Sequence, residues 1–291
     1  MSKRILVIGA NGMLGGSLHR YFSCSGKYEI LGTVRSETAK TLLAERGFMN
    51  VQAGVDALDN VSLAKVIDFF KPDIVFNCVG LIKQMDDSKK PISAIEINAL
   101  LPHQLALLCS GSGAKLVHFS TDCVFAGKKG GYTESDIPDA SDMYGRSKLL
   151  GEVIYDGHLT LRTSIIGHEL ESNVSLIDWF LSQSANVKGF SKAFFSGLPT
   201  IYVAEFIETF ILYNPSLSGL YHLSVDRIDK FHLLQLVKRQ YGIATQIEEY
   251  FDFEIDRSLN SDALRSAVGF VPPSWPELIK RMHDEYIKNF Q

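Results

Sequence analysis

A glycine-rich segment near the start of the chain most constrains its fold. Residues 5–8 form the aliphatic run Ile-Leu-Val-Ile, and Gly9, Gly12 and Gly15 follow it. A short aliphatic run that ends on glycine is typical of a buried parallel strand. From Met13 onward apolar side chains recur at helical spacing, so the glycines are predicted to occupy a turn between a strand and a helix.

This turn has the composition of a dinucleotide-binding loop. Gly9 permits the tight turn, Gly12 lets the backbone approach a pyrophosphate, and Gly15 lets the helix pack against the strand. The phosphates would lie on amide groups at the positive end of the helix. The spacing is G-x-x-G-x-x-G, not the G-x-G-x-x-G of the simplest dehydrogenases, and an ordinary strand–helix turn is the alternative. The residues predicted to bind a cofactor here are Gly9, Asn11, Gly12, Met13, Leu14 and Gly15.

Strand and helix patterns alternate through the first half of the chain. Strands are predicted at 4–9, 29–34, 50–55, 73–80 and 115–120, with helices at 37–46, 60–70 and 91–111. This alternation predicts a Rossmann-type α/β fold, a doubly wound parallel sheet with helices on both faces. Later elements are predicted as helices at 173–184, 203–213, 229–241, 260–267 and 275–289, with a strand at 219–224. We expect residues 1–165 and strand 219–224 to form the nucleotide-binding domain, and residues 166–291 a smaller, interleaved substrate-binding lobe.

Charge and composition argue against several classes of protein. A formal net charge of −4 gives no electrostatic footprint for nucleic acid. No apolar run approaches the length that spans a bilayer, and the N-terminal one is too short for a signal peptide, so we expect a cytoplasmic protein without a membrane partner. The cysteines are scattered and lack histidines at ligand spacing, so neither a disulfide nor a metal site is predicted.

A tyrosine and a lysine four residues apart form the predicted chemical centre. Tyr144 and Lys148 lie in a segment, residues 141–156, that is predicted to be helical, so both side chains share one face. A phenol has a pKa of about 10, and a neighbouring ammonium lowers it. Ser120 and Thr121 end a predicted strand, where a hydroxyl can polarise the carbonyl that the tyrosine protonates. A Y-x-x-x-K pair on a surface helix is the alternative.

Several segments together resemble a known family. They are the glycine loop, Ser120-Thr121-Asp122-x-Val124-Phe125-x-Gly127, Tyr132-x-Glu134-x-Asp136 and Tyr144-Gly145-x-Ser147-Lys148-Leu149-x-Gly151-Glu152. The set resembles the extended short-chain dehydrogenases/reductases, and within them the dTDP-4-dehydrorhamnose reductase group. The resemblance runs nearly from end to end, because Leu259-Asn260-Ser261-Asp262-x-Leu264 and Trp275-x-x-x-Leu278 are similar to that group's C-terminal region.

The resemblance implies a role for each matching position. Thr121 would hydrogen-bond the developing alkoxide, Tyr144 would donate the proton, and Lys148 would hold the cofactor ribose and tune Tyr144. Further cofactor contacts are implied for Asp56, Ala57, Cys78, Val79, Gly80, Asn98 and Ser120. Substrate contacts are implied for Lys83, Asp122, Cys123, Asn173 and Arg257. The alternatives are that Asp56 only caps a turn and that Asn98 faces solvent.

The implied activity is reduction of the C4 carbonyl of a nucleotide-linked 4-keto-6-deoxyhexose by a nicotinamide cofactor, in the synthesis of cell-surface polysaccharide precursors. Two departures put the dTDP-linked sugar in doubt. Cys123 stands where the group has tyrosine, and residues 79–84 lack its A-Y-T-x-V-D pattern. Both positions are expected to face the sugar, so a related sugar on another nucleotide, such as an N-acetylated one on UDP, fits as well.

Two other functions compete with this one. An epimerase-reductase resembling GDP-fucose synthase would also carry a cysteine at the place of Cys123. That family needs a histidine before a V-x-x-L-I-like stretch, whereas Asn173 precedes Val174 here and His168 lies five residues before Asn173. The other competitor is a non-catalytic subunit resembling the regulatory β chain of methionine adenosyltransferase.

The end of the second predicted strand indicates the cofactor. An NAD site carries an acidic residue there, on the ribose 2′-hydroxyl. This chain has Arg35 and Ser36, which suit a 2′-phosphate, so we expect NADPH in preference to NADH, a surface arginine being the alternative. Residues 91–111 and 142–157 resemble the helix pair through which many relatives dimerise, so a homodimer is expected, although the oligomeric state is otherwise open.

Overall fold

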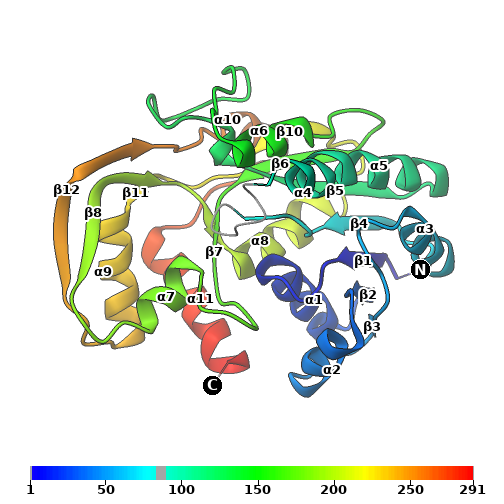
Figure 1. Cartoon of the computed structure of the whole chain (residues 1–291), viewed down its shortest axis with the longest axis horizontal. Helices are drawn as coiled ribbons and strands as arrows, with labels where there is room; N and C mark the ends of the chain where they lie inside the picture. Colours follow the sequence, from blue (N-terminus) through cyan, green and yellow to red (C-terminus); the bar gives the residue numbers. More distant parts are fainter. Residues whose placement is uncertain (1, 83–89, 291) are drawn as a thin grey trace.

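A parallel sheet forms the centre of the protein (Figure 1). The structure, a computed structural model, describes residues 2–82 and 90–290. The strands of this sheet are β1 (Arg4–Ile8), β2 (Glu29–Thr33), β3 (Val51–Gln52), β4 (Ile74–Asn77), β5 (Lys115–Thr121), β6 (Leu159–Thr163) and β10 (Gly219–His222). Their order is β10-β6-β5-β4-β1-β2-β3, and every neighbouring pair is parallel. Because the chain starts at the centre and winds outward in both directions, the predicted doubly wound fold is confirmed.

Helices cover both faces of the sheet. One face carries α1 (Met13–Ser25), α2 (Glu37–Glu45), α8 (Thr200–Phe206), the π-helix η4 (Ile207–Ile211) and α11 (Trp275–Asn289). The other carries α3 (Asn60–Phe70), α5 (Leu101–Ser112) and, at its edge, α6 (Met143–Leu150). Alternation along β1 decides which face each side chain joins, because Ile5 and Val7 pack towards α1 whereas Leu6 and Ile8 pack towards α3.

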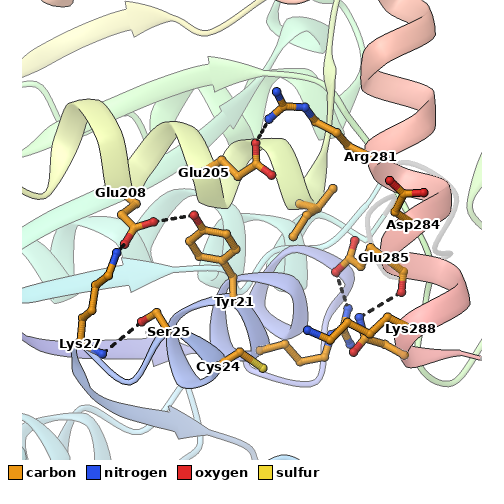
Figure 2. A pocket seen from close by; sticks show the side chains of 13 residues that line it. Tyr21, Cys24, Ser25, Lys27, Glu205, Glu208, Arg281, Asp284, Glu285 and Lys288 are labelled. Carbon is orange, nitrogen blue, oxygen red and sulfur yellow. Dashed lines mark hydrogen bonds and ion pairs between the residues drawn. The ribbon is translucent and has the colours of Figure 1, made fainter.

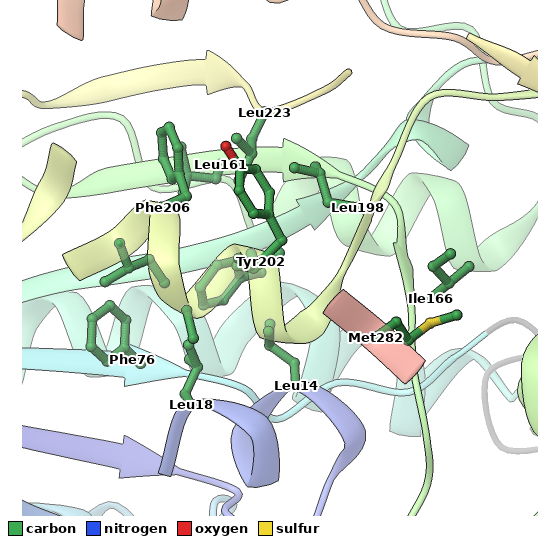
Figure 3. Packing of buried hydrophobic residues seen from close by; sticks show 14 of the residues in the cluster. Leu14, Leu18, Phe76, Leu161, Ile166, Leu198, Tyr202, Phe206, Leu223 and Met282 are labelled. Atoms are coloured by element: carbon green, nitrogen blue, oxygen red, sulfur yellow. The ribbon is translucent and has the colours of Figure 1, made fainter. Parts of the chain in front are cut away.

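The larger core cluster joins the first and last parts of the chain. Leu14 and Leu18 of α1 pack with Phe206 of α8, Phe76 of β4 and Met282 of α11 (Figure 3). Each such side chain contributes roughly 1.5–3 kcal/mol when it is fully buried. The C-terminal part therefore packs against the sheet itself and holds α1, and with it the glycine loop, in place.

The second half of the chain contains strands that the sequence pattern did not predict. β8 (Val187–Phe195) pairs with β11 (Ile228–Asp229) and β12 (Ile247–Asp256), and α9 (Lys230–Tyr241) packs on β8. The shorter elements are β7 (Ile165–Ile166), α7 (Leu176–Leu181), β9 (Leu198–Pro199) and α10 (Asp262–Val268). β12 is an edge strand with acidic side chains on a largely exposed surface, so it lacks the apolar alternation that marks a half-buried strand.

Two further expectations need correction. The helix expected over 141–156 ends at Leu150, because Gly151 is pressed against η2 (Ile95–Leu100), where a Cβ atom would lie 2.0 Å from the Asn98 carbonyl oxygen. The helix expected over 91–111 is confirmed, as the continuous run of α4 (Pro91–Ala94), η2 and α5. This helix corrects the expectation that no apolar segment approaches the length of a bilayer span, because among the described residues it alone is long and apolar enough to cross one. Core helices of soluble proteins meet the same criterion, and 44% of its most apolar stretch is buried. The homodimer expected through this helix stays a prediction.

Candidate active site

The glycine loop joins β1 to α1 at the carboxyl end of the sheet. Gly9 has a φ of +86°, and a Cβ atom there would lie 2.7 Å from Val79. A Cβ atom on Gly15 would lie 2.1 Å from the Gly9 carbonyl oxygen, so only glycine allows this approach. A Cβ atom on Gly12 would meet nothing closer than 3.6 Å, and α1 begins there without a side-chain cap. The first amides of α1 can therefore bind an anionic group.

Asn98 fixes the chain that follows β4. It lies in the π-helical segment η2 and is almost fully buried. Its Oδ1 accepts a hydrogen bond from the Leu81 amide at 2.9 Å, and its Nδ2 donates to the Leu81 carbonyl at 3.4 Å and to Ser147 Oγ at 3.2 Å. Asn98 thus ties the stretch that contains Val79 and Gly80 to α6 and does not face solvent. A contact between Asn98 and a cofactor stays a prediction.

Thr121 and Tyr144 meet at the end of β5. Thr121 closes the strand, and its Oγ1 accepts from the Cys123 amide at 3.1 Å, which begins the 3-10 turn η3 (Asp122–Val124). Gly145 permits α6 to touch this turn, because a Cβ atom there would lie 2.3 Å from the Cys123 carbonyl oxygen. Burial and the neighbouring Cys123 raise the pKa of Tyr144, outweighing a hydrogen bond with Thr121 that lowers it. Tyr144 is therefore a protonated phenol at neutral pH.

Lys148 lies one helical turn after Tyr144 and is buried. Its Nζ donates to the Phe119 carbonyl at 2.7 Å. Burial lowers the pKa of Lys148 to about 8, and Glu152 counteracts part of this effect. A Cβ atom on Gly80 would lie 3.8 Å from this Nζ, so the lysine reaches the stretch after β4 that contains the predicted cofactor contacts Val79 and Gly80. The structure thus brings Thr121, Tyr144 and Lys148 together, as the sequence predicts.

A buried ion pair behind Ser120 was not predicted. Glu152, just after α6, and Arg162 of β6 form a bidentate ion pair in which both N–O distances are 2.7 Å. The Glu152 side chain is 7% exposed and the Arg162 side chain 4%. Ser120 Oγ donates to Glu152 at 2.7 Å, and Arg162 also contacts His222 of β10 at 3.3 Å. The hydroxyl proton of Ser120, a predicted cofactor contact, is therefore already donated to the Glu152 carboxylate. The available signal was an arginine inside the otherwise uncharged strand Leu-Thr-Leu-Arg-Thr.

The other predicted cofactor positions lie along the same edge of the sheet. Arg35 is exposed just beyond β2, and Ser36 Oγ accepts from the Ala39 amide at 3.2 Å as the N-cap of α2. Asp56 Oδ1 accepts from the Leu58 amide at 2.9 Å, so it does cap a turn. Three further side chains are half-buried: Asn11, Met13 and Ala57. Leu14 belongs to the core and can offer only its backbone to a ligand.

The predicted substrate residues divide into three groups. Arg257 lies near Asp122 and Cys123 of η3, because its Nε donates to the Phe125 carbonyl at 2.8 Å. Burial raises the pKa values of Asp122 and Cys123, and the charge of Arg257 counteracts part of this rise. Asn173 is exposed in the loop before α7. Lys83 lies outside the described residues. Within residues 2–82 and 90–290, no cluster of three or more metal-binding side chains occurs.

A cavity of about 500 Å³ lies elsewhere, between the C-terminal half of α1, α8 with η4, and α11 (Figure 2). Most of its charges are paired within the wall. Glu208 accepts from the Tyr21 hydroxyl at 2.5 Å and from Lys27 at 3.1 Å, and Glu205 pairs with Arg281. None of the predicted site residues that the structure describes lines this cavity, and its contacts join η4 to α1 and α8 to α11.

The strand order defines a Rossmann-type sheet, and the Thr121–Tyr144–Lys148 group lies at its carboxyl end. The chain belongs to the family described as RmlD substrate binding domain, which matches residues 3–288. The family expected from the sequence motifs is confirmed.

Individual relatives include both enzymes and a subunit. The chain is 26% identical over 231 residues to dTDP-4-dehydrorhamnose reductase from Aggregatibacter actinomycetemcomitans, covering 76% of this chain and 73% of that one. It is 27% identical over 239 residues to methionine adenosyltransferase 2 subunit beta from Xenopus tropicalis, covering 76% and 67%. The crystal structure of dTDP-4-dehydrorhamnose reductase from Bacillus anthracis in complex with NADP has a TM-score of 0.80 at 23% identity, covering 98% and 100%.

Proposed function

We propose that this chain is an NADPH-dependent reductase of a nucleotide-linked 4-keto-6-deoxyhexose, acting in the cytoplasm on precursors of cell-surface polysaccharide. One observation carries the proposal: Thr121, Tyr144 and Lys148 converge beside a glycine loop whose first helical amides have no side-chain cap. Membership of the RmlD family and the similarity to a dTDP-4-dehydrorhamnose reductase support it.

Each catalytic side chain is in the state that this reaction needs. The glycine loop would hold the pyrophosphate of NADPH, which supplies the hydride when bound. Tyr144 is protonated because burial raises its pKa, so it can donate its proton to the carbonyl oxygen of the substrate. Thr121 can donate a hydrogen bond to the same oxygen. Lys148, with a pKa of about 8, is mostly protonated at pH 7 and can stabilise the phenolate that remains.

The proposal is tested by NADPH oxidation with a panel of 4-keto-6-deoxy sugars on dTDP, UDP and GDP. Steady turnover with at least one of them is expected, with the 4-hydroxy sugar as product in equal amount. A purely binding role, as for a regulatory subunit, would give cofactor binding without turnover. NADPH bound tightly but oxidised with no member of the panel would contradict the reductase.

The same assay in deuterated water separates a reductase from an epimerase-reductase. Burial and the charge of Asp122 raise the pKa of Cys123 to about 12, so at neutral pH its sulfur is a thiol and a poor base. We therefore expect no deuterium at C3 or C5 of the sugar. Cys123 would instead form part of the wall of the sugar pocket. Deuterium at either carbon that disappears in Cys123→Ser would establish epimerisation.

Arg35 is proposed to select NADPH over NADH. It is exposed at the end of β2 and its guanidinium can bind a 2′-phosphate. Arg35→Ala is expected to lower kcat/KM for NADPH about tenfold or more and to leave that for NADH nearly unchanged, because a hydrogen bond to a charged group is worth about 1.5–3 kcal/mol. Lys40→Ala, on the first turns of α2, is the matched control and should change neither value. Equal efficiency with both cofactors in the wild type would refute the proposal.

A further inference from the structure

A buried histidine lies beneath the candidate active site without any role assigned so far. His118 of β5 is 1% exposed and lies opposite Asn77 of β4 in the register of the two strands. Asn77 Oδ1 accepts from the Val79 amide at 3.1 Å, which fixes the orientation of the side-chain amide. Asn77 Nδ2 therefore faces His118 Nδ1, at 3.2 Å, and donates to it.

This contact fixes the protonation of the imidazole ring. A nitrogen that accepts from an amide N–H carries no proton, so the proton of neutral His118 is on Nε2. Burial, the charge of Lys148 and that of His103 together hold the pKa of His118 well below its usual range. His118 thus stays neutral, and its Nε2–H has no hydrogen-bond partner among the described residues. Buried N–H groups nearly always have an acceptor, from protein or from bound water.

Lys148 is the neighbouring donor with protons to spare. Its Nζ binds the carbonyl of Phe119, the residue next to His118 in β5, and this bond uses one of three N–H groups. Of the charged groups near His118, Lys148 lowers its pKa most. The charge of Glu152 acts on Lys148 in turn and raises the pKa of the lysine. His118 lies two residues after Leu116 in β5, so its side chain is on the sheet face that carries α5 and α6, the helix of Lys148. Two donors, His118 Nε2–H and Lys148 Nζ–H, are therefore on one face of β5 at neighbouring residues, and neither can accept from the other.

We propose that a water molecule is bound between His118 Nε2 and Lys148 Nζ and accepts a hydrogen bond from each. A water oxygen has the two lone pairs that this requires, and buried waters typically make about three hydrogen bonds. With Phe119 and the water on two of its N–H groups, Lys148 keeps the third for the active site, where the Tyr144 oxygen and the ribose that the proposed function assigns to Lys148 share it. His118 is then a positioning residue for the reaction, a role that rests on the proposed function, whereas the water site does not.

The experiment compares His118→Leu, which removes the donor, with His118→Gln, whose amide can place an N–H near the position of Nε2. The pKa of Lys148 is measured in the full-length protein by NMR of ¹³Cε-labelled lysine, and Lys148→Met assigns the signal. Without the water, the ammonium loses an acceptor, so its pKa should fall by about one unit in His118→Leu. His118→Gln should keep it near the wild-type value.

A control variant and two direct observations complete the test. His158→Leu removes another buried histidine, whose Nδ1 accepts from the Leu116 amide at 3.1 Å and whose Nε2 lies 3.0 Å from the Ala106 carbonyl, and it should leave Lys148 unchanged. In the wild type, ¹⁵N shifts should show the Nε2–H form of His118, and a high-resolution crystal structure should show the water. An Nδ1–H form, or no water at that point, would overturn the proposal even if His118→Leu fails to fold.

Activity then separates the two proposals. If the reductase is correct, the alkaline limb of the kcat/KM profile should move to lower pH in His118→Leu by the same amount as the Lys148 titration. A lower Lys148 pKa in His118→Leu, with no keto-sugar reduced even by the wild type, would support the water site and reject the reductase. An unchanged titration in a folded, active His118→Leu rejects the positioning role.

Discussion

Replacing Tyr144 by phenylalanine is expected to lower kcat about 10²–10⁴-fold, the usual contribution of a general acid, and to leave the affinity for NADPH nearly unchanged. The variant removes one hydroxyl group and keeps the aromatic ring, so it changes little of the surface that the cofactor would contact. Because burial keeps the pKa of Tyr144 high, the wild-type phenol is fully protonated over the working pH range. Stopped-flow measurement of NADPH oxidation gives the chemical step, and cofactor fluorescence gives the affinity.

Two variants make this result specific. Tyr155→Phe removes a hydroxyl just beyond α6 that contacts His103 at 2.7 Å, and should leave kcat unchanged. Lys148→Met should lower both turnover and cofactor affinity, since the lysine is proposed to hold the ribose as well as to stabilise the phenolate. Near-wild-type turnover in Tyr144→Phe would remove Tyr144 from the reaction.

Much of the sheet was predictable because its central strands are apolar on both sides. β1, β2, β4 and β5 are covered by helices on both faces, so each appears in the sequence as a short aliphatic run beside a turn. β12 could not be found in this way, because its acidic and aromatic side chains are mostly exposed and its pairing with β8 joins residues about sixty positions apart. The early end of α6 depends on a contact between Gly151 and η2, which no local pattern reveals.

The site shows the same division. Tyr144 and Lys148 are four residues apart on one helix, so local spacing was enough to place them together. Thr121 was added because it ends a predicted strand and because the family resemblance implies its role. The buried polar residues around this group come from distant strands. Arg162 is on β6 and His222 is on β10. The protonation of His118, whose Nε2 has no partner among the described residues, is set by a hydrogen bond from Asn77 on the neighbouring strand. Three-dimensional pairing, which local spacing does not encode, selects these residues.

Arg162→Leu is expected to lower the free energy of unfolding by about 3–5 kcal/mol, because it leaves the Glu152 carboxylate buried without its partner. Arg162 also lies over the Phe125 ring, 5.3 Å from its centroid, and contacts His222, so no solvent is available to replace it. Denaturant unfolding at pH 7 measures the loss. Lys280→Leu, which breaks the exposed pair with Asp284, should cost less than about 1 kcal/mol.

The double variant Glu152→Leu/Arg162→Leu tests the physical cause of that loss. If the cost of Arg162→Leu is an uncompensated buried charge, removing the carboxylate as well should recover part of the stability, because two apolar side chains need no partner. If the cost is lost packing against Phe125, the double variant should be less stable than either single one. Recovery is expected, and it would show that the pair fixes the arrangement of β6 and β10 behind Ser120 more than it stabilises the fold. A double variant that unfolds more easily than Arg162→Leu would contradict this account.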